Sequence, residues 1–287
     1  MSPRPHPSAA IGKPSAAAAA QTHGFDPQFV ARVLDDALST RSRVYAIAGL
    51  QGSGKSTLAA QLAAAAQARG LRTAVLSIDD FYLGRRERRQ LGRRVHPLLA
   101  TRGPPGTHEV ALACAVLDDL REGRPVRLPR FDKLRDTRLP PSRWTRAAAV
   151  DLAVFEGWFL GAPAQTSAEL VAPVNALERD EDPQGVWRRY CNDALAADYP
   201  ALWSRIDRLL WLQPPGFEIV AGWRWQQEQA MQRQRPQHKA MSRPQVERFV
   251  ALFERVSRQA LLRLPQIADW TVALDAQRRL LAPHRPD

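Results

Sequence analysis

The chain has 287 residues, of which 45% are hydrophobic, enough to form the core of one large domain. Its 41 Lys and Arg residues outnumber its 29 Asp and Glu residues, and the resulting net charge of +12 favours anionic partners, either small substrates or nucleic acid. No apolar run of about 18 residues is present, and Cys114 and Cys191 lack the neighbours that a disulfide framework or a zinc site requires, so we expect a soluble, cytoplasmic protein without a membrane span.

The first 24 residues are rich in Pro, Ala and Ser and predict a disordered N-terminal extension rather than a signal peptide. We expect one folded domain over residues 25–287, beginning with a helix at Asp26-Pro27. Residues 43–48 and 72–78 predict buried strands, and the apolar spacing between them predicts a helix that ends near Gly70. Strand, helix and strand in such a short stretch form a βαβ unit, which implies a parallel sheet.

The rest of the chain continues this alternation. Further strands are predicted at 149–155, 208–212 and 270–274. Helices are predicted at 109–120, 186–195, 199–203, 217–234 and 245–264. Residues 84–106 are polar and rich in Arg, Pro and Gly and predict an irregular, lid-like segment, while 123–141 predicts loops or short strands. The fold class is therefore α/β, a three-layer sandwich with a central parallel sheet, helices on both faces and lid insertions.

A glycine-rich loop follows the first predicted strand and matches the pattern G-x-x-x-x-G-K-[ST]. Its glycines allow successive backbone N–H groups to converge on phosphate oxygens, and the helix behind it points its positive end at the anion. We expect Lys55 to reach the terminal phosphates of ATP and the Ser56 hydroxyl to bind Mg²⁺. The predicted ATP-binding residues are Gly49, Gln51, Gly52, Ser53, Gly54, Lys55, Ser56 and Thr57.

Three carboxylates follow predicted strands. Asp79 and Asp80 end the second strand, at the edge that faces the nucleotide, and phosphoryl transfer to a hydroxyl needs a carboxylate there to accept the proton. Because neighbouring residues on a strand point apart, only one of the two is expected to face the phosphate. Glu156 ends the third strand, where a carboxylate can hold Mg²⁺. The alternatives are a turn or cap role for the Asp pair and a plain strand-end charge for Glu156.

Two Gly- and Pro-containing segments supply candidate acceptor-binding residues, namely 96–109 with Arg102 and His108, and 129–133 with Lys133. Cations suit an anionic hydroxy-acid substrate, although each residue alone is equally consistent with a loop-stabilising role. Arg224 on the 217–234 helix is a candidate lid arginine. For Arg233, Arg235 and Lys239, which follow it, we favour a solvated basic face.

These motifs together resemble a known family. GLQGSGKSTL, SIDDFYL, VHPLLATRGPPGTHEV, PRFDK, VFEGWFLG, WRRYCNDAL, YPALW and GWRWQQEQAM…MSRPQVERFV occur in the order seen in the D-glycerate 3-kinase family, which is similar to uridine kinase, phosphoribulokinase and pantothenate kinase. The resemblance covers about residues 25–275. Two features depart from it: 134–138 is shorter than the usual insertion, and Ala240 stands where Gly is common.

The resemblance implies an alcohol-acceptor phosphotransferase that converts ATP and D-glycerate to ADP and 3-phosphoglycerate. It places Asp79 as base, Glu156 on the Mg²⁺ side, and Asp80, Tyr82, Arg102, His108, Lys133 and Arg224 around the acceptor. A kinase for another hydroxyl substrate, such as uridine or pantothenate, is the same-class alternative. An ATP-binding regulatory or nucleic-acid-associated protein is disfavoured, because no basic helix stands out and a pure binder needs no carboxylate at Asp79. The sequence does not indicate an oligomeric state.

Overall fold

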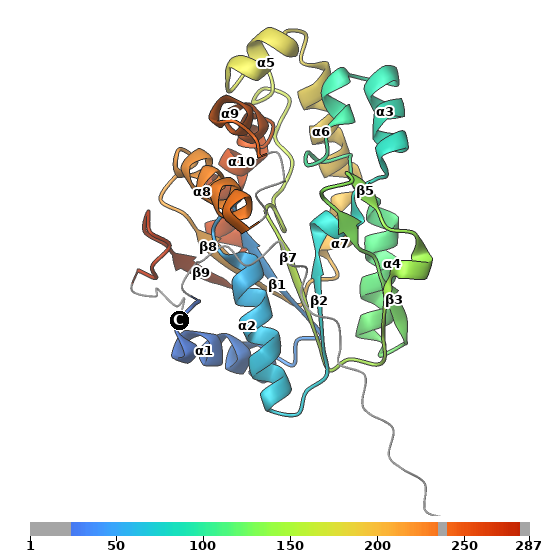
Figure 1. Cartoon of the computed structure of the whole chain (residues 1–287), viewed down its shortest axis with the longest axis vertical. Coiled ribbons are helices and arrows are strands. Elements are labelled where there is room, and N and C mark those ends of the chain that lie inside the picture. The colour runs from blue at the N-terminus through green and yellow to red at the C-terminus, as the bar shows by residue number, and fades with distance from the viewer. Residues whose placement is uncertain (1–23, 235–239, 282–287) are drawn as a thin grey trace, which may run out of the picture.

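The computed structural model describes residues 24–234 and 240–281, and the predicted N-terminal extension, Arg235 and Lys239 lie outside them. A five-stranded sheet with strand order β2-β7-β1-β8-β9 forms its centre, and every neighbouring pair is parallel (Figure 1). The strands are β1 (Val44–Gly49), β2 (Thr73–Ser77), β7 (Leu152–Gly157), β8 (Arg208–Gln213) and β9 (Trp270–Ala273). All five predicted strands and the α/β fold class are therefore confirmed.

Helices cover both faces of the sheet because its central strands are apolar on both sides. Every residue of β1 and β7 is buried, as a parallel sheet between two helical layers requires. Alternate residues of β1 enter different cores. Tyr45 and Ile47 pack with α1 (Pro27–Ser39) and α2 (Lys55–Ala68), whereas Ala46 and Ala48 pack on the other side. The helices of that second layer are α4 (Val110–Arg121), α6 (Val186–Ala197), α7 (Tyr199–Trp203) and α10 (Glu254–Ile267).

The predicted first helix begins as expected, because the Asp26 carboxylate accepts hydrogen bonds from the backbone of Gln28 and Phe29. The single helix predicted over 245–264 is wrong. The chain forms α9 (Arg243–Ala251) and α10, separated at Leu252-Phe253. Leu252 and Phe253 are both buried at the point where the two helices separate.

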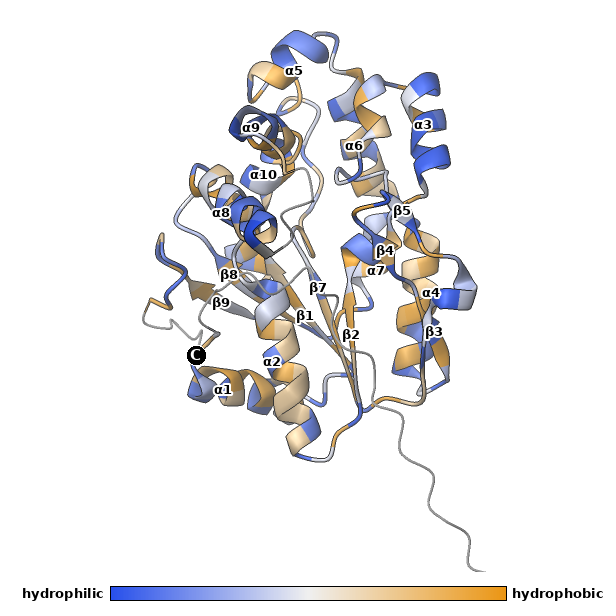
Figure 2. Ribbon diagram, viewed as in Figure 1, coloured by the Kyte–Doolittle hydropathy of each residue, from blue (hydrophilic) through white to orange (hydrophobic). Residues whose placement is uncertain are grey.

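The expectation of an irregular segment over 84–106 is also wrong. It contains α3 (Arg85–Arg94) and the short 3₁₀ helix η3 (Pro97–Ala100). The buried residue of α3 is Arg88, whose guanidinium donates to the carbonyls of Leu83, Ala100 and Asp136. Apolar periodicity cannot reveal a helix that is anchored by an arginine. Six of the ten residues of α3 are arginine, and Figure 2 shows the helix as largely hydrophilic, so the expectation that no basic helix stands out is wrong as well.

The remaining elements frame the sheet. Three short strands in the 123–141 region confirm that prediction. Two of them, β4 (Phe131–Asp132) and β5 (Thr137–Arg138), pair with each other, and the third, β3 (Val126–Leu128), pairs with β6 (Thr145–Ala147), which follows the region. The long helix α8 (Ile219–Gln234) confirms its prediction, and α5 (Ala176–Glu181) was not predicted. Among the described residues, no helix is long and apolar enough to cross a membrane.

Candidate active site

The phosphate-loop motif lies between β1 and α2, at the carboxyl edge of the sheet. Gly52 and Gly54 have φ angles of +86° and +92°, in the left-handed region that favours glycine. A Cβ atom on Gly52 would lie 2.6 Å from Cβ of Trp223, so the loop also needs glycine there for space. The first residue of α2 is Lys55, and the helix therefore begins where the predicted phosphates would sit.

Ser56 and Glu156 meet beside this loop. The Ser56 hydroxyl donates to Oε1 of Glu156 at 2.8 Å, because β7 lies next to β1 and brings Glu156 to the same edge. Glu156 is only 6% exposed, and its Oε2 has no hydrogen-bond partner among the described residues. Burial raises the pKa of this carboxyl, although Lys55 opposes the rise.

The donor chemistry at Ser56 and Glu156 fits Mg²⁺, which prefers oxygen ligands and is usually held by one or two protein groups together with waters and phosphates. A buried carboxylate oxygen without a partner is the kind of group that a cation satisfies. The described residues contain no cluster of three or more His, Cys, Asp or Glu side chains suited to a metal. Most ligands of an ion here would thus have to come from the nucleotide and water.

Asp79 lies on η2 (Ile78–Phe81), a 3₁₀ turn directly after β2, rather than on the strand itself. Its Oδ2 is 2.6 Å from Nζ of Lys133, and its Oδ1 accepts a 2.8 Å hydrogen bond from the Tyr82 hydroxyl. Burial alone would raise the pKa of Asp79, but the charge and hydrogen bond of Lys133, the charge of Lys55 and the Tyr82 hydroxyl hold it well below its usual range. Asp79 is therefore ionised, ion-paired with Lys133 and also under the charge of Lys55 in the phosphate loop.

Asp80 faces away from this group, as expected for one member of the pair. Its carboxylate accepts hydrogen bonds from the Arg130 guanidinium at 2.7 Å and from the Phe131 backbone at 3.1 Å. Both oxygens are therefore used to hold β4 against η2. This geometry argues against the predicted contact with substrate and indicates a structural role.

Tyr82 and His108 adjoin each other beside Asp79. The two residues form an isolated antiparallel bridge, and their rings stack with centroids 4.5 Å apart. His108 is 6% exposed, and burial lowers the pKa of its imidazole to about 3. The ring is consequently neutral, and it acts as a polar rather than a cationic part of the site.

Arg102 and Arg224 enter from different segments. The Arg102 guanidinium donates to Asp136 at 2.6 Å, and Arg224 on α8 pairs with Glu228 at 2.8 Å. Burial lowers the pKa of Arg224, and the positive charge of Arg102 lowers it further, so the two cations repel each other. An anion between them would relieve that repulsion. Arg233, in contrast, is exposed at the end of α8.

Sequence reasoning missed Arg278, which follows β9. Its Nε donates to the carbonyl of Gly52 in the phosphate loop at 2.6 Å, and its guanidinium lies 4.9 Å from the centre of the Trp223 ring. Burial lowers the pKa of Arg278, and no carboxylate in the described part of the chain pairs with it. The only sequence signal was an arginine shortly after the last strand, which is too common in this chain to be noticed.

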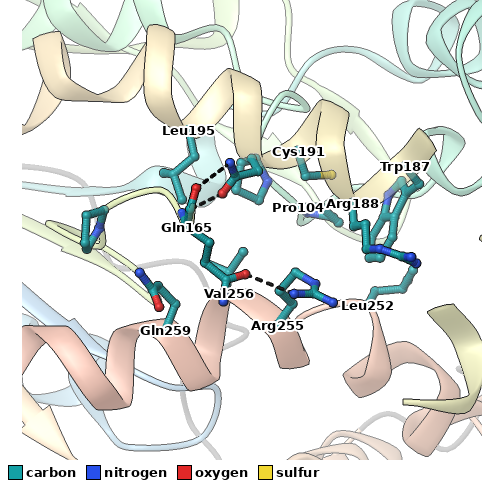
Figure 3. A pocket seen from close by; sticks show the side chains of 13 residues that line it. Pro104, Gln165, Trp187, Arg188, Cys191, Leu195, Leu252, Arg255, Val256 and Gln259 are labelled. Carbon is teal, nitrogen blue, oxygen red and sulfur yellow. Dashed lines mark hydrogen bonds between the residues drawn. The ribbon is translucent and has the colours of Figure 1, made fainter. Parts of the chain in front are cut away.

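A pocket away from the phosphate loop lies between α6 and α10 (Figure 3). It holds about 20 Å³, roughly the room of one water molecule. The two arginines in its lining are engaged elsewhere, Arg188 with Asp182 and Arg255 with Glu178. We therefore regard this pocket as a packing void behind the loop that contains Pro104.

No family model matches the chain. It is 33% identical over 222 residues to the uncharacterized kinase mug58 of Schizosaccharomyces pombe, covering 73% of this chain and 78% of that protein. It is 32% identical over 195 residues to the chloroplastic D-glycerate 3-kinase of Arabidopsis thaliana, covering 63% of this chain and 40% of that one. A solved structure of D-glycerate 3-kinase from Cryptococcus neoformans superposes with a TM-score of 0.72 at 23% identity, covering 91% and 97% of the two chains, which shows a shared fold.

Proposed function

Because the chain belongs to the D-glycerate 3-kinase family of P-loop kinases, we propose that it transfers the γ-phosphoryl group of ATP to D-glycerate, giving ADP and 3-phosphoglycerate. The observation that carries this proposal is the placement of Asp79 between Lys55 of the phosphate loop and Lys133 of the opposite segment. A nucleotide-binding protein without an acceptor has no use for an ionised carboxylate at that point.

The roles that we propose rest on this geometry. Lys55 neutralises charge on the terminal phosphates, and the Asp79 carboxylate accepts the proton of the attacking hydroxyl. Ser56 and Glu156 are the residues that would hold Mg²⁺. When bound, the ion shields the negative charge that otherwise keeps the nucleophile away from the phosphates.

The acceptor side carries positive charge. The cationic side chains of Lys133 and Arg102 can bind the carboxylate of a hydroxy acid. The stacked, neutral rings of Tyr82 and His108 form a polar surface beside Asp79. Arg224, partly buried on α8 and repelled by Arg102, is the arginine that we assign to the transferring phosphoryl group. A cytoplasmic location belongs to the same proposal, and the free thiols of Cys114 and Cys191 support it.

An acceptor screen tests the substrate. Purified protein with ATP and Mg²⁺ is assayed for ADP release with D-glycerate, uridine or pantothenate, and the Lys55→Ala variant serves as the blank. We expect ADP release that depends on D-glycerate, with 3-phosphoglycerate as the phosphorylated product. If D-glycerate gives no release while uridine or pantothenate does, the same-class alternative replaces it.

A second candidate, binding of nucleic acid, is favoured by one observation. A groove of about 640 Å³ beside α3 is lined by Arg85, Arg86, Arg89, Gln90, Arg93, Arg135 and Thr137. The four α3 arginines among these have no ion-pair partner in the described part of the chain. ATPase activity that is stimulated by a DNA or RNA oligonucleotide, and that survives Asp79→Asn, would support this candidate over the kinase.

A further inference from the structure

The hydroxyl group of Tyr199 connects two motifs that the proposed roles leave unexplained, the Gly-Thr-His segment and the Tyr-Pro-Ala-Leu-Trp segment. Its oxygen accepts a hydrogen bond from the Gly106 backbone at 3.2 Å and lies 2.6 Å from Nδ1 of His108. Tyr199 is fully buried at the start of α7, where Phe159 and Trp203 pack around its ring. Solvent therefore does not compete for either contact.

The protons at this hydroxyl can be accounted for. The Gly106 N–H is necessarily a donor, so the Tyr199 oxygen is the acceptor in that hydrogen bond. The hydroxyl's own proton then needs an acceptor, and Nδ1 of His108 is the one hydrogen-bond acceptor that the described residues place within reach. A nitrogen that accepts carries no proton. Because burial keeps the imidazole neutral, its single proton must be on Nε2.

The resulting Nε2–H group is unused. Nε2 of His108 is buried and has no hydrogen-bond partner among the described residues. The ring stacks on Tyr82, whose hydroxyl binds Asp79, and the charge of Asp79 is felt at the imidazole. The unsatisfied Nε2–H donor of His108 is thus separated from the proposed base, Asp79, only by the side chain of Tyr82. A buried donor without a hydrogen-bond partner is unfavourable, and a ligand that supplies the acceptor would remove this cost.

We propose that Tyr199 is a positioning residue that fixes His108 as the neutral Nε2–H tautomer, so that His108 donates a hydrogen bond to an oxygen of the hydroxy-acid acceptor. This inference rests on the proposed kinase function for its ligand, but the tautomer itself does not depend on it. Because the His108 ring is neutral, it can donate to an oxygen of the hydroxy acid without competing with the Lys133 cation for the carboxylate of that substrate. Gly106, whose N–H donates to the Tyr199 hydroxyl, contributes to this positioning. Its φ of +84° favours glycine, and a Cβ there would lie 2.7 Å from the Tyr190 ring.

The tautomer is measured directly by NMR on protein labelled with ¹⁵N-histidine, in which His108→Gln identifies the His108 signals. We expect the wild-type ring to be neutral with its proton on Nε2, and we expect Tyr199→Phe to lose that single state, because no hydroxyl then donates to Nδ1. A proton on Nδ1, or a charged ring at neutral pH, in the wild-type protein overturns the proposal. The wild-type spectrum alone can overturn the proposal, and it needs neither an active enzyme nor a folded Tyr199 variant.

Kinetics test the consequence for the acceptor. Tyr199→Phe and His108→Gln should each raise KM for D-glycerate by about tenfold with little change in KM for ATP, and the double variant should lose little more. The matched control is Tyr190→Phe, on the adjoining helix, whose hydroxyl makes no hydrogen bond among the described residues. Equal effects of both Tyr→Phe changes would overturn the positioning role. If no acceptor reacts at all, the proposed function fails while the NMR result stands.

Discussion

Nζ of Lys133 lies 2.6 Å from Oδ2 of Asp79, so the proposed base is ion-paired with a cation from the acceptor side. The pair keeps Asp79 ionised despite its burial, but it also weakens the carboxylate as a proton acceptor. A substrate carboxylate that draws Lys133 toward itself would restore the basicity of Asp79. The acceptor would then activate its own base, a relationship that the variants below examine.

Asp79→Asn should reduce kcat by about 10²- to 10⁴-fold, because the amide cannot accept the hydroxyl proton. KM for ATP should change less than kcat, since the hydrogen bonds of Asp79 go to Tyr82 and Lys133, and only the charge of Lys55 reaches it from the phosphate loop. Steady-state kinetics with each substrate varied checks both expectations. A kcat near that of the wild-type enzyme would remove Asp79 from the mechanism.

Asp80→Asn is the matched comparison at the neighbouring position. Its carboxylate holds Arg130 and the Phe131 backbone, so we expect a lower free energy of unfolding rather than a loss of the chemical step. Thermal denaturation and kcat are measured on the same preparation. If Asp80→Asn lowers kcat as strongly as Asp79→Asn without loss of stability, the division of roles within the pair is wrong.

Lys133→Met should move the acidic limb of the kcat/KM profile to higher pH. In the wild-type protein Lys133 holds the pKa of Asp79 below its usual range, so the base stays ionised into acidic solution. Without the lysine, the pKa of Asp79 rises above its wild-type value, so activity is lost at a higher pH as the solution is acidified. KM for D-glycerate should rise as well. An unshifted limb with a raised KM would restrict Lys133 to substrate binding.

The sequence predicted those parts of the site whose chemistry requires particular residue types at short, fixed spacings along the chain. A phosphate loop needs its glycines, Lys55 and Ser56 within eight residues, and parallel strands bring Glu156 to the same edge as that loop. Long-range contacts leave no such pattern. Arg278 reaches Gly52 from the far end of the chain, and Tyr199 reaches His108 across 91 positions. Helix α3 was missed for a related reason, because an arginine, not an apolar side chain, is its buried anchor.

Arg88→Met should lower the free energy of unfolding by about 3 kcal/mol, because three partly buried carbonyl groups lose the donor that the buried guanidinium provides. Arg89→Met is the control, since it changes an exposed arginine of the same helix and should stay within about 0.5 kcal/mol of the wild-type protein. Urea denaturation measures both. Similar values for the two variants would show that Arg88 does not anchor α3.

Glu156→Gln should raise the Mg²⁺ concentration that gives half-maximal activity by about tenfold or more, because a charged oxygen ligand is lost.

The same Glu156→Gln change should raise Tm. Burial raises the pKa of Glu156, so keeping it ionised at neutral pH costs stability, and this cost grows as pH rises through the raised pKa. The Ser56 hydroxyl can still donate to the amide oxygen. A Tm that falls, with an unchanged Mg²⁺ requirement, would indicate a structural strand-end charge instead.

Arg278→Ala should raise KM for ATP by about tenfold and leave KM for D-glycerate nearly unchanged, because the guanidinium holds the Gly52 carbonyl and adds unpaired positive charge beside the phosphate loop. Arg278→Lys should not rescue it, since an ammonium lacks the planar group that packs on Trp223 while donating to Gly52 and Gln226. Arg279→Ala is the control, because that exposed side chain pairs with Asp275 within its own loop. Equal KM values for ATP in the Arg278 and Arg279 variants would place Arg278 outside the nucleotide site. A selective effect would extend that site to the end of the sheet, where the motif alone gave no reason to look.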